Sequence, residues 1–87
     1  IANNFSNHLV VIAEKLLEKN KIDKNLIKPL IFETFKKLNK TSAIDAQTGP
    51  AIRKDKETID KHIDHLSESD FLNLYKIVTK NIMSNEL

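Results

Sequence analysis

The residues that could do chemistry gather first in one short stretch. The segment "QTGPAIR", residues 47–53, contains the only glycine, the only arginine and one of the two prolines of the chain. Thr48 offers a hydroxyl, Gly49 allows a close backbone approach, and the N–H groups after Pro50 point outward at a helix start, which suits anions and carbonyl oxygens. Arg53 adds a forked donor for a carboxylate or phosphate. The alternative interpretation is an ordinary connector between two helices, which a Gly-Pro pair more often marks.

The three histidines are the second set of candidate functional residues, for metal binding or proton transfer. His62 and His65 stand three residues apart in "HIDH", a spacing at which two imidazoles on one helix can share a metal ion. No other segment nominates a third ligand, so we interpret them as histidines on an amphipathic helix and predict no metal site. His8, which follows Asn7, is either a histidine at a domain interface or a proton donor that faces a cleft, since imidazole titrates near neutrality.

Composition excludes several function classes. The sequence has no cysteine, no Gly-rich phosphate loop, no dinucleotide fingerprint and no nucleophile–base–acid set, so the chain by itself is not predicted to be an enzyme. Its longest apolar run, Leu9–Ala13, is too short for a membrane span, and its start lacks the features of a signal peptide. The net charge of +2 comes from interleaved lysines and acids, which argues against a nucleic-acid interface.

Helices must position these residues. One glycine in 87 residues and apolar positions at helical spacing predict an all-α fold. Four main helices are expected: from a cap at Asn3 or Asn4 to about Asn20; from a cap at Asp23 or Asn25, with Pro29 in or just after the first turn, to residues 39–41; from Asp55 onward; and from a cap at Ser67 or Ser69 onward. The middle segment is expected to be irregular or one-turn helical, with Ser42 as a cap, Gly49 left-handed and Pro50 opening a turn.

The apolar stripes of these helices predict a thin core. The four phenylalanines are placed in it, and Tyr75 is expected to pack with its hydroxyl at the surface. A chain of this length buries only about 60 to 65% of its unfolded surface, so we expect a partner chain or a neighbouring domain to add stability. The residues expected to face inward are Phe5, Leu9, Ile12, Ala13, Leu16, Leu17, Leu26, Leu30, Ile31, Thr34, Phe35, Leu38, Ile59, Ile63, Leu66, Phe71, Leu72, Leu74, Tyr75, Val78 and Ile82.

Four stretches together resemble a known family: "NNFSNHLVVIAEKLL", "LIKPLIFETFKKL", "AQTGPAIRKDKETIDKHIDHL" and "LYKIVT". They are similar to the C-terminal helical domain, a domain of unknown function, of bacterial Rossmann-like proteins named as NADP oxidoreductases, which are related to pyrroline-5-carboxylate reductase-like dehydrogenases. The resemblance runs from about Ala2 to Lys80 and is most specific in "TGPAIRKD" and "TIDKHIDHL". Lys54 stands where the family commonly has Gly, and Ile63 where it has Leu; these departures touch the turn and the core packing and leave the polar residues unchanged.

The resemblance implies a compact bundle like the C-terminal domain of 6-phosphogluconate dehydrogenase-like proteins. It further implies that residues 1–87 form one dimerisation and substrate domain, a fragment that follows an upstream Rossmann domain. The full protein would be a cytoplasmic homodimer that transfers hydride between NADP and a small carbonyl or imine substrate. The fragment itself is expected to bind no cofactor, no metal, no nucleic acid and no membrane, and to be inactive alone.

The same resemblance implies a site in the cleft between the two domains. His8 would be the catalytic proton donor. The substrate-binding residues would be Asn7, Gln47, Thr48, Gly49 and Arg53. A different class remains open: a standalone all-α protein-interaction module without catalysis. The first interpretation predicts a strand and a "GxGxxG" turn upstream of Ile1, and the second predicts a start codon close to Ile1.

Overall fold

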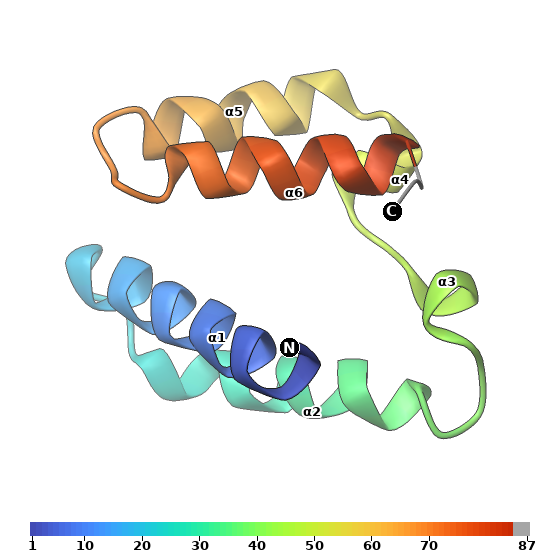
Figure 1. Ribbon diagram of the computed structural model, residues 1–87. Helices are drawn as coiled ribbons and strands as arrows, with labels where there is room; N and C mark the ends of the chain where they lie inside the picture. Colours follow the sequence, from blue (N-terminus) through green and yellow to red (C-terminus); the bar gives the residue numbers. More distant parts are fainter. Residues whose placement is uncertain (85–87) are drawn as a thin grey trace. The chain divides into compact units, whose positions relative to one another are not determined.

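The structure, a computed structural model, describes residues 1–84, and every regular element in this range is a helix (Figure 1). The predicted all-α class is therefore confirmed, with four longer helices and two one-turn helices in the middle. None of the helices within residues 1–84 is long and apolar enough to cross a membrane. The elements are α1 (Ala2–Lys19), the 3₁₀ helix η1 (Lys24–Ile27), α2 (Lys28–Lys37), α3 (Ala43–Ala46), α4 (Pro50–Arg53), α5 (Lys56–Leu66) and α6 (Leu72–Ser84).

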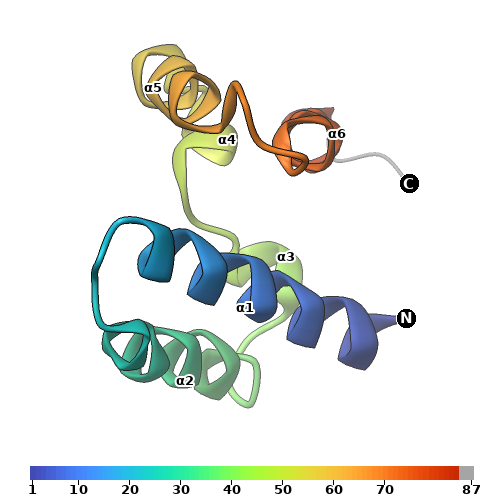
Figure 2. The same cartoon turned by 90° about the vertical axis from the view of Figure 1, so that its left-hand side faces the viewer.

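The chain divides into two compact units, Ile1–Ala43 and the part from Ile44 onward. In the first unit, α1 and α2 run antiparallel and η1 leads into α2 (Figures 1 and 2). α1 ends because Lys21 adopts a left-handed conformation, with φ at 58°. The N–H of Lys21 then donates to the carbonyl of Glu18 at 3.0 Å, and that of Ile22 donates to the carbonyl of Leu17 at 2.9 Å. This bonding pattern satisfies carbonyls at the helix end and turns the chain back.

Some helix boundaries in the first unit differ from those expected. The N-cap of α1 is Ile1 rather than Asn3 or Asn4, because the carbonyl of Ile1 already accepts the N–H of Phe5 at 2.8 Å and the helix extends to the first residue. Asp23 does cap, but it caps η1: its Oδ1 accepts the N–H of Asn25 at 2.9 Å. The tighter 3₁₀ turn therefore takes the predicted cap, and α2 starts later, at Lys28.

Pro29 lies in the first turn of α2, as predicted, where a proline costs little because the first N–H groups have no partner within the helix. α2 ends at Lys37, two residues before the expected range of 39–41. A series of turns follows, in which the N–H groups of Asn39 and Lys40 donate to carbonyls three residues back. The end of the helix has thus frayed into turns.

In the second unit, two tight turns lead into an antiparallel pair, α5 and α6, which lie side by side (Figures 1 and 2). Gly49 has a positive φ of 100° as predicted, and Pro50 opens α4. Asp55 caps α5, because its Oδ1 accepts the N–H of Thr58 at 3.2 Å. Ser69 marks the approach to α6, since its Oγ accepts the N–H of Phe71 at 3.0 Å. The cap at Asp55 was predicted correctly, because it acts over three residues. The predicted cap at Ser67 or Ser69 was wrong, because α6 begins at Leu72 and the bond of Ser69 to Phe71 precedes the helix.

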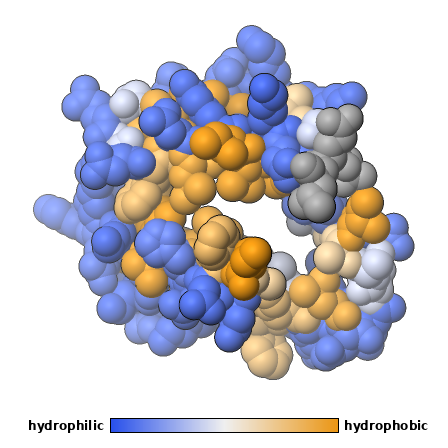
Figure 3. Space-filling model, in the orientation of Figure 1, coloured by the Kyte–Doolittle hydropathy of each residue, from blue (hydrophilic) through white to orange (hydrophobic). Residues whose placement is uncertain are grey.

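The core is thinner than the stripes predicted. Among the described residues, the buried apolar ones are Ile12, Ala51, Ile59 and Leu66. The placement of all four phenylalanines in the core was wrong: Phe5 is 66% exposed and Phe32 is 68% exposed, Phe35 is also exposed, and Phe71 alone is half-buried. Leu74 and Val78 on α6 also remain more than one third exposed. Figure 3 shows such apolar side chains at the molecular surface.

The reason lies in how few elements are available to cover each helix. α1 is apolar on two sides: Val10 lies toward α2, while Phe5 and Leu9 lie on another side of the helix. Because α2 is the long helix paired with α1 in this unit, it can cover one of these sides only. A periodic apolar pattern predicts which residues seek burial, but it does not supply the partner that buries them.

Candidate functional site

The predicted site segment is a turn whose polar groups bond partly to the local backbone. The Nε2 of Gln47 donates to the carbonyl of Thr48 at 3.0 Å. Gly49, with φ at 100° and ψ at 174°, lies in a region that essentially only glycine adopts. A Cβ atom at this position would meet no atom within 4 Å, so the backbone conformation, and not a lack of space, requires glycine here. The open space beside it leaves room for another group to approach.

Arg53 lies one turn further on and is loosely tethered. Its Nη2 is 3.7 Å from Oδ2 of Asp55, and its side chain is 59% exposed. The same Oδ2 accepts the hydroxyl of Thr58 at 2.8 Å. These bonds hold the pKa of Asp55 below its ordinary value: the Thr58 hydroxyl contributes most, then the Thr58 N–H, and the Arg53 charge adds to them. Asp55 is thus a fixed carboxylate, and the guanidinium beside it extends into solvent, where it can bind an acid group.

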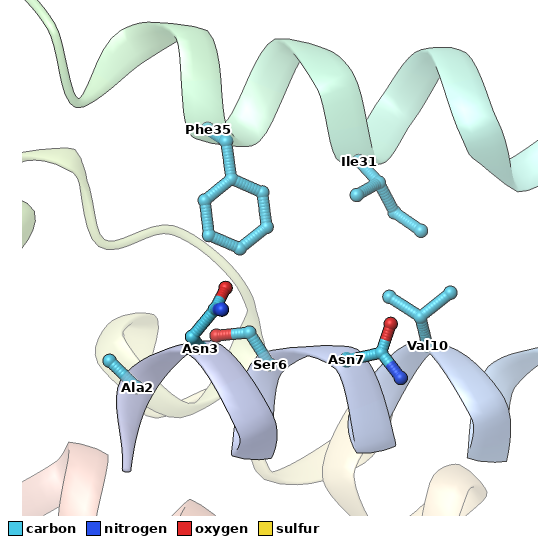
Figure 4. A pocket seen from close by; sticks show the side chains of 7 residues that line it. All are labelled: Ala2, Asn3, Ser6, Asn7, Val10, Ile31 and Phe35. Atoms are coloured by element: carbon cyan, nitrogen blue, oxygen red, sulfur yellow. The ribbon is translucent and has the colours of Figure 1, made fainter.

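A pocket of about 500 Å³ lies between α1 and α2 (Figure 4). α1 contributes the polar side chains Asn3, Ser6 and Asn7, and α2 contributes the apolar side chains Ile31 and Phe35 opposite them. Its volume is within the range of small-molecule sites, and hydroxyl and amide groups facing an apolar wall can orient a small polar ligand. Among the residues that the structure describes, no charged side chain lines it. The pocket therefore suits a neutral polar group better than an ion.

The pocket includes one predicted site residue, Asn7. Sequence reasoning missed Asn3 and Ser6, although Asn3 lies three residues before Ser6 and four before Asn7, which places it on the same side of the helix as each. His8, the predicted proton donor, is an exposed residue of α1 and does not line this pocket. Asn7 and His8 belong to the first unit, whereas Gln47–Arg53 belongs to the second. That both segments line one cleft stays a prediction.

The structure pairs a histidine with a tyrosine that the sequence did not connect. The Nδ1 of His62 on α5 lies 2.9 Å from the hydroxyl of Tyr75 on α6, and the two rings meet edge-on with centroids 5.7 Å apart. Residues thirteen apart meet because α5 and α6 form a hairpin, which periodicity does not reveal. Within residues 1–84, no group of three or more His, Cys, Asp or Glu side chains is placed to hold a metal ion.

The fold and these features define an all-α domain with a glycine-proline turn and a polar pocket on its first helix. The chain belongs to the family described as "Domain of unknown function (DUF2520)", whose model matches residues 1–82. Among curated proteins, none matches the sequence. The resemblance inferred from the quoted stretches is confirmed at the level of the family.

One solved structure extends this comparison. The chain is similar to the crystal structure of a "putative NADP oxidoreductase" from Bacteroides fragilis, with 35% sequence identity and a TM-score of 0.90. The similarity covers 93% of this chain but only 32% of that protein. The chain therefore spans about a third of the length of the protein that it matches.

Proposed function

We propose that this chain is the helical C-terminal dimerisation and substrate domain of an NADP-dependent oxidoreductase of the cytoplasm, with a Rossmann domain upstream of Ile1. The observation that carries the proposal is the similarity, over nearly the whole chain, to one third of a protein named as an NADP oxidoreductase. The other two thirds of such a protein leave room for a nucleotide-binding domain. The reaction would transfer hydride between NADP and a small carbonyl or imine substrate, where the cofactor supplies the chemistry and the protein positions and encloses the substrate.

Within this proposal, the pocket between α1 and α2 supports a substrate role for Asn7. Its amide can both donate and accept, so it can hold a carbonyl oxygen or an imine nitrogen beside the neutral groups of Asn3 and Ser6. Arg53 would neutralise an acid group of the substrate, because its guanidinium is exposed and only loosely paired.

The turn and His8 have further roles in the proposal. Thr48 and the backbone at Gly49 would hold a second polar group of the substrate, with Gln47 bracing the turn through its bond to the Thr48 carbonyl. His8 is exposed on α1, next to Asn7, and would transfer the proton that accompanies hydride transfer.

Steady-state kinetics on the full-length protein tests these roles. Asn7→Ala and Arg53→Ala are expected to raise KM mainly, because each removes binding contacts. His8→Ala is expected to lower kcat by about 100-fold, the usual scale of a lost proton donor. His65→Ala, another exposed histidine, is the matched control and should leave both constants unchanged. Unchanged turnover in the His8 variant, with folding intact, would remove His8 from the mechanism.

The proposed homodimer is supported by an uncharged apolar face. Phe5 and Leu9 are exposed one turn apart on α1, on a side that carries no charged residue between them. Such a face can meet its own copy across a two-fold axis without like-charge repulsion. Phe5→Glu is expected to raise the dimer dissociation constant at least tenfold in sedimentation equilibrium, whereas Asn4→Glu, on the neighbouring polar side, should change it little. Equal effects of the two substitutions would point to charge alone and count against this interface.

The exposed apolar residues also favour a second candidate, a standalone interaction module without catalysis. The coding region upstream of Ile1, over about 150 codons, separates the two, since that is a typical domain length. A strand followed by a "GxGxxG" turn and a helix, together with NADPH binding to the full-length protein, would support the oxidoreductase. A start codon within a few residues of Ile1 would sink it and favour the interaction module.

A further inference from the structure

A second pocket lies within the second unit, against the antiparallel pair α5 and α6. Its volume is about 510 Å³, which is within the range of small-molecule sites. Its apolar lining comes from Ile59 and Ile63 on α5 and from Met83 on α6. Ile59 is among the buried residues of the chain, so this part of the pocket is an extension of the core. None of the site residues predicted from the sequence lines this pocket.

Three of the residues that line this pocket are lysines. Lys54 follows α4, and Lys76 and Lys80 stand one helical turn apart on α6, with the hydroxyl of Thr79 between them. Within residues 1–84, no Asp or Glu is part of the lining. Lysines that line one pocket carry like charges, which repel one another. The binding of an anion would reduce this repulsion.

The three lysines differ from their neighbours on α5 in their pairing. Lys56 lies 3.4 Å from Asp60, and Lys61 lies 3.6 Å from Glu57, both as exposed pairs one turn apart. By contrast, none of the pocket lysines forms an ion pair within residues 1–84. Among residues 1–84, the outer lysines of α5 are therefore paired with acids, whereas the three pocket lysines are not.

The backbone at Lys54 is held in an unfavourable conformation by its turn. Its φ is 55° and its ψ is 39°, a left-handed conformation that disfavours any residue with a Cβ atom. The turn needs this conformation, because the N–H of Lys54 donates to the carbonyl of Ala51 and that of Asp55 donates to the carbonyl of Pro50. Glycine would meet the same need at lower cost.

We propose that this pocket binds a small organic dianion with an apolar body, of the class of aryl or alkyl phosphate esters. The phosphate would lie among the three ammonium groups and the Thr79 hydroxyl, and the apolar body would cover Ile63 and Met83. A dianion is favoured over a monoanion because one negative charge leaves two ammonium groups repelling each other. The proposal is independent of the oxidoreductase assignment, since it uses only residues 54–84.

Titration of the 87-residue chain with three probes tests the ligand class. Phenyl phosphate carries both features, inorganic phosphate lacks the apolar body, and benzoate has the body with a single charge. We expect phenyl phosphate to bind at least fivefold more tightly than either of the others, with affinity that falls as salt is raised. Chemical shifts in amide NMR should change for residues of α6 and for Lys54. Equal affinity for the three probes, or shifts that avoid the pocket, would overturn the proposal.

Substitutions locate the charge and the apolar contact. The double variant Lys76→Gln/Lys80→Gln is expected to weaken phenyl phosphate binding about tenfold, from about two- to fivefold for each exposed charge. The double variant Lys56→Gln/Lys61→Gln loses the same net charge from α5 and should leave binding unchanged. Met83→Ala should weaken phenyl phosphate but not inorganic phosphate. If both double variants lost the same affinity for phenyl phosphate, the effect would come from overall charge, and the proposed site would be wrong.

In the variant Lys54→Gly, weaker ligand binding cannot be explained by a folding defect, because the substitution is expected to stabilise the fold. The substitution removes one ammonium group and at the same time relaxes the left-handed backbone. We therefore expect the variant to unfold at a higher urea concentration while its affinity for phenyl phosphate falls about two- to fivefold. Unchanged affinity in this more stable variant would exclude Lys54 from the site. None of these results bears on NADPH binding by the full-length protein, which tests the proposed function separately.

Discussion

The two units of this chain are each built on an antiparallel pair of helices. The pairs differ in their helix caps, in the side-chain contacts between the helices and in the number of buried residues. The α5–α6 pair is supported by α4, capped by Asp55, and linked across by His62 and Tyr75. The α1–α2 pair has no side-chain cap at either N-terminus. Three of the four buried residues lie in the second unit, and Ile12 alone lies in the first.

Their pockets differ in the same way. The pockets have nearly equal volumes, about 500 and 510 Å³, and both are lined partly by apolar side chains, but the lining of the first includes amides and a hydroxyl and that of the second includes lysines. The first suits a polar uncharged group, and the second suits an anion with an apolar body. A small helical domain can thus present two chemically distinct sites without a deep core, because each site needs only one pair of helices.

The largest difference between the units is expected when one leucine in each is truncated to alanine. Leu66→Ala on α5 removes a buried side chain and is expected to lower the free energy of unfolding by about 2 to 5 kcal/mol. Leu30→Ala on α2 removes a side chain that is 66% exposed and should cost about 0.5 kcal/mol. Urea unfolding monitored by circular dichroism measures both. Equal costs would mean that Leu30 is covered in solution, and the first unit would then be incomplete without a partner.

The next largest effect is expected from removal of the N-cap of α5. Asp55→Ala removes the acceptor of the Thr58 N–H and hydroxyl and should lower the urea midpoint, whereas Asp55→Asn keeps a capping oxygen and should lower it less. Because folding lowers the pKa of Asp55, its ionised form stabilises the folded state above the ordinary value of 3.8. This contribution is lost as pH falls below 3.8, so the difference between wild type and Asp55→Asn should shrink there. A constant difference between pH 7 and pH 3 would contradict the lowered pKa.

The left-handed lysines offer a matched pair, one in each unit. Lys21 and Lys54 have φ values of 58° and 55°, and each ends a helix through the same bonding pattern. Replacing either by glycine should raise the free energy of unfolding by about 0.5 to 1 kcal/mol, the balance of relieved backbone strain and lost chain entropy. Lys21→Gly should leave phenyl phosphate binding intact, which makes it the control for Lys54→Gly. Destabilisation by both would show that these turns do not require the left-handed conformation.

The smallest expected effect concerns the link between α5 and α6. Tyr75→Phe removes the hydroxyl that meets Nδ1 of His62 and should cost about 0.5 kcal/mol, the low end for a hydrogen bond because this one is exposed. In a His62→Ala background the same substitution should have no further effect, and the double-mutant cycle isolates the pair. Additive losses would mean that the two side chains stabilise the hairpin independently.

Much of the fold followed from the sequence because it is set over short distances. The one-turn helix after Gly49, the cap at Asp55 and the role of Pro29 depend on neighbours within a few residues, and each was predicted correctly. The cap at Asn3 or Asn4 failed because nothing local marks how far a helix extends toward the chain start. The phenylalanines failed because burial depends on which elements are present to cover them.

The sequence by itself determined that this protein is helical, where α4 and α5 begin, and which family it belongs to. Only the tertiary structure decided which side of α1 meets α2, that Asn3 and Ser6 join Asn7 at one pocket, and that Lys54 joins Lys76 and Lys80 at the other. The physical reason is the range of the interactions. Caps and turns are fixed by bonds between near neighbours, whereas a pocket requires helices distant in sequence to pack together.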